Sequence, residues 1–165
     1  MQEFYYRMIE DGTYCLTGYK GDETHVVIPD DKNITVLFDK VFAGHDEITS
    51  IHIPDIVTDM GEFLFDGCDR LKHIDLPSSL TYLWGHTFCR CGIEEIELPD
   101  KLESLPPFAF KDCRDLKRVI CGKGMKKIHP WVFGGCESLE EVICGPEVTI
   151  SPQAYEKKTS GIRGQ

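Results

Sequence analysis

One pattern constrains the fold of this chain more than any other: an aromatic residue returns every 22 or 23 residues along most of its length. The ring positions are Phe42, Phe65, Phe88, Phe110, Phe133 and Tyr155. A cysteine follows three residues after four of these rings, at Cys68, Cys91, Cys113 and Cys136, and His45 takes the matching place in the first unit. A unit of this length cannot bury its own apolar stripe, but stacked copies cover one another. The pattern therefore predicts a solenoid with one coil per unit.

Each unit also carries a short apolar alternation, which marks a strand with its apolar side chains facing inward. The first inward position is held by Ile51, Ile74, Ile96, Val119 and Val142. We assign the next apolar position to Ile53, Leu76, Leu98, Ile120 and Ile143. For Ile120 and Ile143 two placements stay open, one at the end of the strand and one on its outer face. The place after the strand falls to Pro29, Pro54, Pro77 and Pro99, and later to Cys121 and Cys144. Proline there stops the ladder from continuing.

A second apolar segment, such as Leu102–Leu105, follows each strand, and the Phe-x-x-Cys segment comes next. We interpret Phe-x-x-Cys as a helical turn on the side opposite the strands, with its ring filling the coil. The predicted fold class is therefore an α/β repeat, a right-handed and slightly curved solenoid of short strands and helical turns.

The two ends of the chain differ from the repeats. Residues 4–9 and 13–17 are strand-like and flank a turn signal at 10–12, which predicts a β-hairpin. We expect residues 1–25 to form this N-terminal cap, 26–155 to form about five and a half repeats, and 156–165 to be a disordered tail. Because no C-terminal cap is recognisable, the edge at 145–155 is expected to be open to self-association.

The charge and the apolar runs exclude several classes of function. A net charge of -10 disfavours nucleic acid and anionic membranes as partners, since both require basic patches. The longest aliphatic run, at 26–28, is far too short for a transmembrane helix. The N-terminus lacks a basic region followed by an apolar stretch, so we expect no signal peptide, and the compartment stays open.

Eight cysteines would suggest disulfides in a short secreted chain, but their regular spacing favours another interpretation. Cys68, Cys91, Cys113 and Cys136 are expected to form a buried, reduced ladder, because in-register side chains about 4.8 Å apart are too distant for a disulfide. A line of thiols also cannot converge on zinc. Cys121 and Cys144 are expected to form a second short ladder, and Cys15 and Cys89 to be the exposed thiols. Reduced thiols would favour an intracellular location.

The repeat as a whole resembles a known family. The segment Leu71-x-x-Ile74-x-Leu76-Pro77-x-x-Leu80-x-x-Leu83-x-x-x-x-Phe88-x-x-Cys91 is similar to the BspA-like class of leucine-rich repeats. Residues 11–21, followed by 26–29, resemble the leader that precedes the first repeat in that family. The resemblance covers about residues 11–155. It implies bacterial or protist proteins, often exposed on the cell surface, that bind host or matrix proteins.

The candidate site is the outward face of the strands. We predict that the partner-binding residues are Ser50, His52, His73, Asp75, Glu95, Glu97, Arg118 and Glu141. His52 and His73, with Asp75 and Glu97 near them, are chemically able to hold a metal. We favour a polar contact surface without metal, because charged surface clusters are usually solvated.

Protein–protein recognition through this face is the leading functional hypothesis, with host or matrix adhesion as its more specific form. The alternative is a structural spacer or self-assembling element without a specific ligand. No nucleophile, phosphate-binding or metalloprotease motif is present, so we expect neither an enzyme nor a cofactor.

Overall fold

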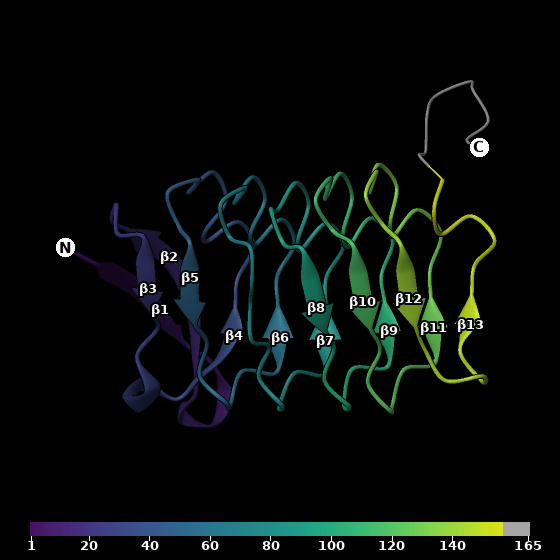
Figure 1. The fold of residues 1–165 in the computed structure, drawn as a ribbon. Coiled ribbons are helices and arrows are strands. Elements are labelled where there is room, and N and C mark those ends of the chain that lie inside the picture. Colours follow the sequence, from purple (N-terminus) through teal and green to yellow (C-terminus); the bar gives the residue numbers. More distant parts are fainter. Residues whose placement is uncertain (157–165) are drawn as a thin grey trace, which may run out of the picture.

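The computed structural model describes residues 1–156, which form a solenoid with two rows of short strands running along its length (Figure 1). The first row contains β3 (His25–Val27), β5 (Ser50–His52), β8 (Glu95–Glu97), β10 (Arg118–Ile120) and β12 (Glu141–Ile143). The second row contains β4 (Ile34–Leu37), β6 (Asp59–Met60), β7 (Tyr82–Leu83), β9 (Ser104–Leu105), β11 (Lys127–Ile128) and β13 (Thr149–Ile150). Within each row the paired strands are parallel, as a coil that returns in one direction requires.

The predicted right-handed solenoid is confirmed, with about six turns where the sequence predicted about five and a half repeats, but the predicted helical turns are wrong. In the described part of the chain, helix is limited to two short 3-10 segments, η1 (Glu10–Gly12) and η2 (Asp30–Lys32). The Phe-x-x-Cys segments are turns instead. In the third coil, His86 and Arg90 flank Phe88 with φ of 60° and 55°. A left-handed residue on both sides of the ring cannot be accommodated in a right-handed helix.

The N-terminal cap is the predicted hairpin. β1 (Glu3–Met8) pairs antiparallel with β2 (Tyr14–Lys20), and η1 lies between them. β2 then pairs in parallel with β4, so the hairpin extends the second row of strands and covers the first coil. Tyr19 packs against Phe42 with the rings tilted and their centroids 5.3 Å apart. The predicted boundaries at residues 25 and 155 stay predictions, and the predicted tail lies outside the described residues except for Glu156.

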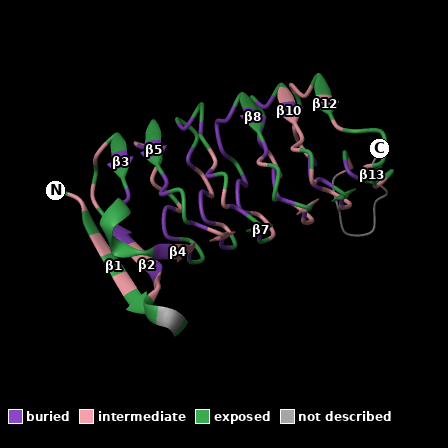
Figure 2. Ribbon diagram, turned by 90° about the horizontal axis from the view of Figure 1, so that it is seen from below, coloured by how far each residue is buried: buried purple, intermediate pink, exposed green. Residues whose placement is uncertain are grey.

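The aromatic column runs through the core as predicted. Phe42, Phe65, Phe88, Phe110 and Phe133 are buried and stack in order, and Tyr155 continues the stack at its half-exposed end. Centroid separations between neighbouring rings run from 5.1 Å for Phe88 and Phe110 to 5.9 Å for Phe110 and Phe133. Figure 2 shows buried stretches within the coils and exposed residues both at the turns and along strands such as β5, β8 and β12. Stacked rings of this kind fill the coil and also gain ring–ring attraction.

The repeated cysteines have a second role besides filling space. Each thiol of the ladder donates a hydrogen bond to the carbonyl of the aromatic residue one coil earlier, at Sγ–O distances of 2.9–3.2 Å. The four thiols are Cys68, Cys91, Cys113 and Cys136, all of them free. Burial raises the pKa of Cys68 and of Cys136 to about 12. The ladder is therefore protonated and satisfies a carbonyl in each preceding coil.

Three predictions about the other cysteines are wrong. Cys15 and Cys89 are buried, at 2% and 5% exposure. Burial raises the pKa of both thiols, to about 11 for Cys89. Cys121 and Cys144 form a disulfide between adjacent coils. Their Cα atoms lie 5.0 Å apart, which is within the range that disulfides span, so adjacent strands do not exclude such a bond.

The register of the last strands also corrects the sequence assignment. Val119 lies opposite Ile96, and Ile120 therefore lies opposite Glu97, on the outer face. Ile143 lies opposite Ile120 and is 40% exposed. Cys121 and Cys144 consequently take the inward place of Leu98, one position earlier than the proline place that the sequence suggested. The signal was available, since 119 and 120 are adjacent whereas 96 and 98 are two apart.

Candidate functional site

The candidate site is the outer surface of the first strand row, which we call the strand face. In β3, β5, β8 and β10 the central residue is buried, and in β12 it is partly buried; the residues before and after it face outward. The outward residues form two columns. The first column is His25, Ser50, His73, Glu95, Arg118 and Glu141, and the second is Val27, His52, Asp75, Glu97, Ile120 and Ile143. All eight predicted residues therefore belong to one face.

The face is interrupted once. Residues 73–75 form no strand, and the row consists of a pair, β3 and β5, and a triplet, β8, β10 and β12. The Glu94 amide still donates to the Lys72 carbonyl over 3.1 Å, so this coil keeps its place beside β8. His73 and Asp75 are strongly exposed, with side chains 72% and 93% exposed. The interruption thus presents a polar pair at the centre of the face.

Around Arg118 the charges alternate along the column. Its guanidinium lies between Glu95 and Glu141, at 3.7 Å from Glu95 Oε1 and 2.8 Å from Glu141 Oε1. The short contact has the distance of an ion pair but not the direction of a hydrogen bond, because Nε has no hydrogen-bond partner. Such half-exposed pairs contribute little to stability. They do fix the positions of three charged groups across three strands.

The two histidines do not converge. His52 Nε2 lies 2.9 Å from Asp30 Oδ1, whereas His73 Nε2 lies 2.8 Å from Asp75 Oδ1. Each imidazole therefore has a carboxylate partner of its own. The partner of His52 comes from the preceding coil, and the partner of His73 from the same coil. Among residues 1–156, no group of three or more His, Cys, Asp or Glu side chains is arranged to hold a metal ion.

A hollow of about 350 Å³ lies where the face is interrupted. It is lined by His73, Ile74, Asp75, Leu76, Glu95 and Glu97. Three carboxylates and one imidazole surround a floor of two apolar side chains, which suits a cationic side chain with an apolar stem. Four of the eight predicted residues line this hollow.

Two residues at the start of the strand face were not predicted from the sequence. His25 belongs to the first column, and its Nδ1 lies 2.6 Å from the Ser50 hydroxyl oxygen. Val27 belongs to the second column and is 55% exposed. The alternation of residues 25–28 before Pro29 repeats that of 50–53 before Pro54, and this was the signal that could have located both residues.

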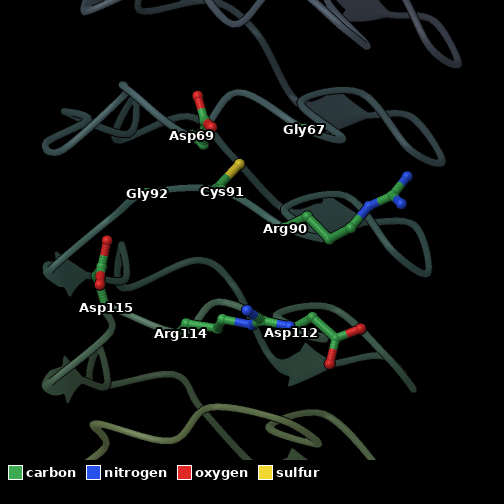
Figure 3. A pocket seen from close by; sticks show the side chains of 8 residues that line it. All are labelled: Gly67, Asp69, Arg90, Cys91, Gly92, Asp112, Arg114 and Asp115. Carbon is green, nitrogen blue, oxygen red and sulfur yellow. The ribbon is translucent and has the colours of Figure 1, made fainter.

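A second hollow, of about 450 Å³, lies among the turns that follow Phe65, Phe88 and Phe110 in the sequence (Figure 3). Its charged lining residues are Asp69, Arg90, Asp112, Arg114 and Asp115. Asp69 and Asp115 lie toward one side of the view and Arg90 toward the other. Arg90 donates two hydrogen bonds of 2.8 Å to the Asp66 carboxylate, and Lys72 pairs with Asp115 at 3.1 Å. Arg90 and Asp115 are therefore both paired with residues outside the lining, and we do not place a binding site here.

Comparison with known proteins identifies the repeat. The family described as BspA type leucine rich repeat region matches residues 35–161 in six copies. No curated protein matches the sequence. In the described part of the chain there is no helix with the length and apolar character needed to cross a bilayer.

Solved structures with the same fold come from several bacteria. A leucine-rich cell surface protein of Faecalibacterium prausnitzii aligns with a TM-score of 0.77 at 23% identity, over 90% of this chain and 38% of its own. The leucine-rich-repeat protein of T. pallidum aligns with a TM-score of 0.72 at 25% identity, over 89% of this chain and 82% of its own. A leucine-rich-repeat protein of Bacteroides ovatus gives 0.60 at 26% identity, over 85% and 45%. This chain thus spans less than half of two of these relatives.

Proposed function

Since this chain belongs to the BspA-type leucine-rich-repeat family, we propose that it is a protein-recognition module whose strand face binds a partner. Repeats of this kind generally mediate protein interactions. The observation that carries the proposal is the arrangement of the strand face. Its charged and polar side chains stand in two columns on a rigid, preformed surface, so little ordering is needed on binding.

The charges of the face indicate the chemistry of the partner. Asp75, Glu95, Glu97 and Glu141 are carboxylates, and Arg118 is the one arginine or lysine in the two columns. A surface with this excess of negative charge attracts a basic segment and repels an acidic one. Ile120 and Ile143 add apolar contact area at the end of the face. We therefore propose a partner that presents lysine or arginine side chains in an extended segment.

Adhesion to host or matrix proteins is the more specific form of the proposal. The relative from Faecalibacterium prausnitzii is described as a cell surface protein, which makes extracellular proteins reasonable candidates for a first search. We propose no catalytic step: the Ser50 hydroxyl meets the His25 imidazole on this face, but no described side chain orients that imidazole, as nucleophilic catalysis requires.

The test is capture with the purified solenoid. The unmodified protein and the variant His73→Ala/Asp75→Ala/Glu97→Ala are immobilised in parallel and exposed to lysate and to purified matrix proteins. All three side chains are on the surface, so the variant should keep its melting temperature. A partner retained by the unmodified protein and lost by the variant supports the proposal. Equal retention by both proteins contradicts the placement of the site.

Self-assembly is the second candidate, and a specific observation favours it. Ile143, Ile150 and Tyr155 are 40%, 37% and 49% exposed, and β12 and β13 are the edge strands of the described solenoid. Edge strands can pair with another chain. Sedimentation equilibrium of the unmodified protein beside Ile150→Asp tests this. Association that the substitution abolishes supports it, and a monomer at all concentrations contradicts it.

A further inference from the structure

The hairpin that caps the first coil leaves one edge of its sheet open. β1 is the first strand in the order β1-β2-β4-β6-β7, and among residues 1–156 no second strand pairs with its other side. Figure 2 shows β1 at the N-terminal end of the solenoid. At the same end of the first row the edge of β3 is covered, because the Val27 amide donates to Gln2 Oε1 and Gln2 Nε2 donates to the His25 carbonyl, both over 3.2 Å. An uncovered edge strand such as β1 can pair with another strand.

The hydrogen bonds of the hairpin indicate which residues of β1 face the open edge. The Ile9 amide donates to the Thr13 carbonyl over 2.9 Å, and the Tyr5 carbonyl accepts a bond of 3.1 Å from the Thr17 hydroxyl. Main-chain groups of successive strand residues point to opposite sides, so the odd-numbered residues of β1 face β2. The extra residue at the register shift, Thr17, belongs to β2, so this alternation continues through β1. The main-chain groups that point to the open edge are therefore those of Phe4, Tyr6 and Met8.

The side chains of β1 are complementary to a second copy of the same strand. Glu3, Tyr5 and Arg7 alternate with the half-buried Phe4 and Tyr6, and all three are exposed. If two copies pair antiparallel with Tyr5 opposite Tyr5, each Glu3 lies opposite the partner's Arg7 and each Phe4 opposite the partner's Tyr6. Phe4 and Tyr6 are then hydrogen-bonded pairs, as their main-chain direction requires. Glu3 and Arg7 are in the non-hydrogen-bonded positions, where opposite side chains approach more closely.

Other arrangements of the two strands lack this charge match. A slide of one step that keeps the same main-chain groups at the edge places Arg7 opposite Tyr5 in one direction and Glu3 opposite Tyr5 in the other. Parallel pairing in register would place Glu3 beside Glu3 and Arg7 beside Arg7, and like charges in these positions are destabilising. The charges of β1 therefore select one antiparallel register.

The neighbouring charges leave Glu3 and Arg7 available for this contact. Among the described residues, Arg7 has no carboxylate at ion-pair distance, and its guanidinium carbon lies 5.7 Å from the centre of the Phe38 ring. Glu3 accepts a hydrogen bond of 3.0 Å from the Tyr5 hydroxyl through Oε2 alone. Lys20 lies opposite Glu3 on β2, so basic and acidic positions would alternate across the joined strands. The exposed carboxylate of Glu10 follows β1 and falls outside the paired residues.

We infer that β1 is the contact of a two-fold dimer, in which the β1 edges of two copies pair antiparallel and join their five-stranded sheets into one. Both copies use the same residues, so the assembly closes at two. The partly buried rings of Phe4 and Tyr6 would lose further exposed surface against the partner. A six-residue edge is a small interface, so the dimer should dissociate on dilution. β1 belongs to the other row of strands, so the dimer would keep two strand faces free and could hold a repetitive partner more tightly than one copy.

Charge exchange between the two positions tests the pairing, measured by sedimentation equilibrium of the full chain. Every protein carries Ile150→Asp, so that association through the C-terminal edge does not contribute. Glu3→Arg makes both positions basic, and Arg7→Glu makes both acidic. Each variant alone should dimerise at least about tenfold more weakly than the parent, because like charges then face each other. An equimolar mixture of the two variants should form a heterodimer about as tight as the parent dimer, since every acidic position again meets a basic one.

Cross-linking tests the register, since the two-fold axis passes between the two copies of residue 5. In a non-hydrogen-bonded antiparallel pair the Cα atoms are about 4.5 Å apart, which a disulfide can span. With oxidised glutathione as the oxidant, Tyr5→Cys should form a covalent dimer on a non-reducing gel. Met8→Cys is the matched control, because residue 8 is also exposed on β1 but lies opposite Gln2 of the partner subunit. It should cross-link at least about tenfold more slowly.

A monomer at every concentration would overturn the inference, and the β1 edge would then be open to a strand of another protein instead. A dimer that is indifferent to Glu3→Arg and Arg7→Glu, or a mixture that associates no better than either variant alone, would also overturn it. So would equal cross-linking of Tyr5→Cys and Met8→Cys. All these changes lie on β1 and none on the strand face, so failure here leaves the proposed function untouched.

Discussion

Single side chains in the buried aromatic column carry much of the stability of the coil. Phe88 is completely buried and stacks between Phe65 and Phe110, at 5.6 and 5.1 Å. Phe88→Ala should lower the free energy of unfolding by about 3–5 kcal/mol, because it leaves a cavity that the neighbouring coils cannot close. Urea denaturation measures this. Tyr82→Ala, on the exposed face, is the control and should cost well under about 1 kcal/mol. Equal losses in the two variants would show that the column is not the core.

His86 makes the stability of the protein depend on pH. Its ring belongs to an outer stack, between Phe63 and Phe108, with centroid distances of 4.4 and 4.7 Å. Burial, followed by the charge of Lys111, lowers the pKa of His86 below its ordinary value of 6.5. Below about pH 6.5 the unfolded chain therefore binds a proton before the folded chain does. The stability that neutral His86 provides is complete above that pH and is lost as the pH falls toward the lowered value.

The expected result is a smaller pH effect in His86→Phe. The melting temperature of the unmodified protein should fall more between about pH 7.5 and about pH 5 than that of the variant. Part of the fall should remain, because burial also lowers the pKa of His129. Identical pH dependence in both proteins would mean that His86 is not shielded by the stack.

At the residue scale, the sequence predicted the inward positions well because their spacing is fixed by the coil. It did not predict the roles of individual thiols. The hydrogen bond from Cys91 to the Phe65 carbonyl depends on the stacking of two coils, and no local pattern contains it. Cys89 was expected to be exposed, yet its side chain is buried.

At the scale of the element, the turns rather than the strands distinguish this fold from the predicted one. The Phe-x-x-Cys spacing is compatible with a helical turn, and only the backbone shows that left-handed residues stand on both sides of the ring. Glycine occupies one of these places at Gly44, Gly67 and Gly135, but Arg90 and Asp112 take it in the coils between. The glycine signal for a left-handed turn was therefore present in three coils and absent from two.

Close approach between coils makes one glycine essential to the turn. A Cβ atom at Gly92 would lie 2.0 Å from the Asp69 carbonyl oxygen, which is backbone of the preceding coil. Gly92→Ala should therefore destabilise the protein by at least about 1–3 kcal/mol, since the coils must separate. Gly85→Ala is the matched control, because its nearest neighbour, the Pro107 carbonyl oxygen, would be 3.2 Å away. Thermal unfolding that ranks Gly85→Ala as the more harmful change would refute the close contact.

At the scale of the whole molecule, the fold was the most predictable property and the partner the least. Because five positions recur at the same spacing in successive units, every unit must form a coil of the same size. The family match agrees with this prediction. The strand face was predictable in outline because the alternation in each strand is regular. The outer ring stack was not, since Phe63, Phe108 and Trp131 resemble ordinary core residues in the sequence and only the structure shows them half-buried. A surface that binds protein has no spacing rule comparable to that of a catalytic motif.

A hydrogen-exchange footprint can show whether the strand face is the surface that recognises a protein. Amide exchange is compared for the free solenoid and for its complex with the partner that capture identifies. We predict slower exchange in β5, β8 and β10 and in residues 73–75, with no change along β4, β6 and β7. Protection confined to residues 145–155, or to the second strand row, would contradict it.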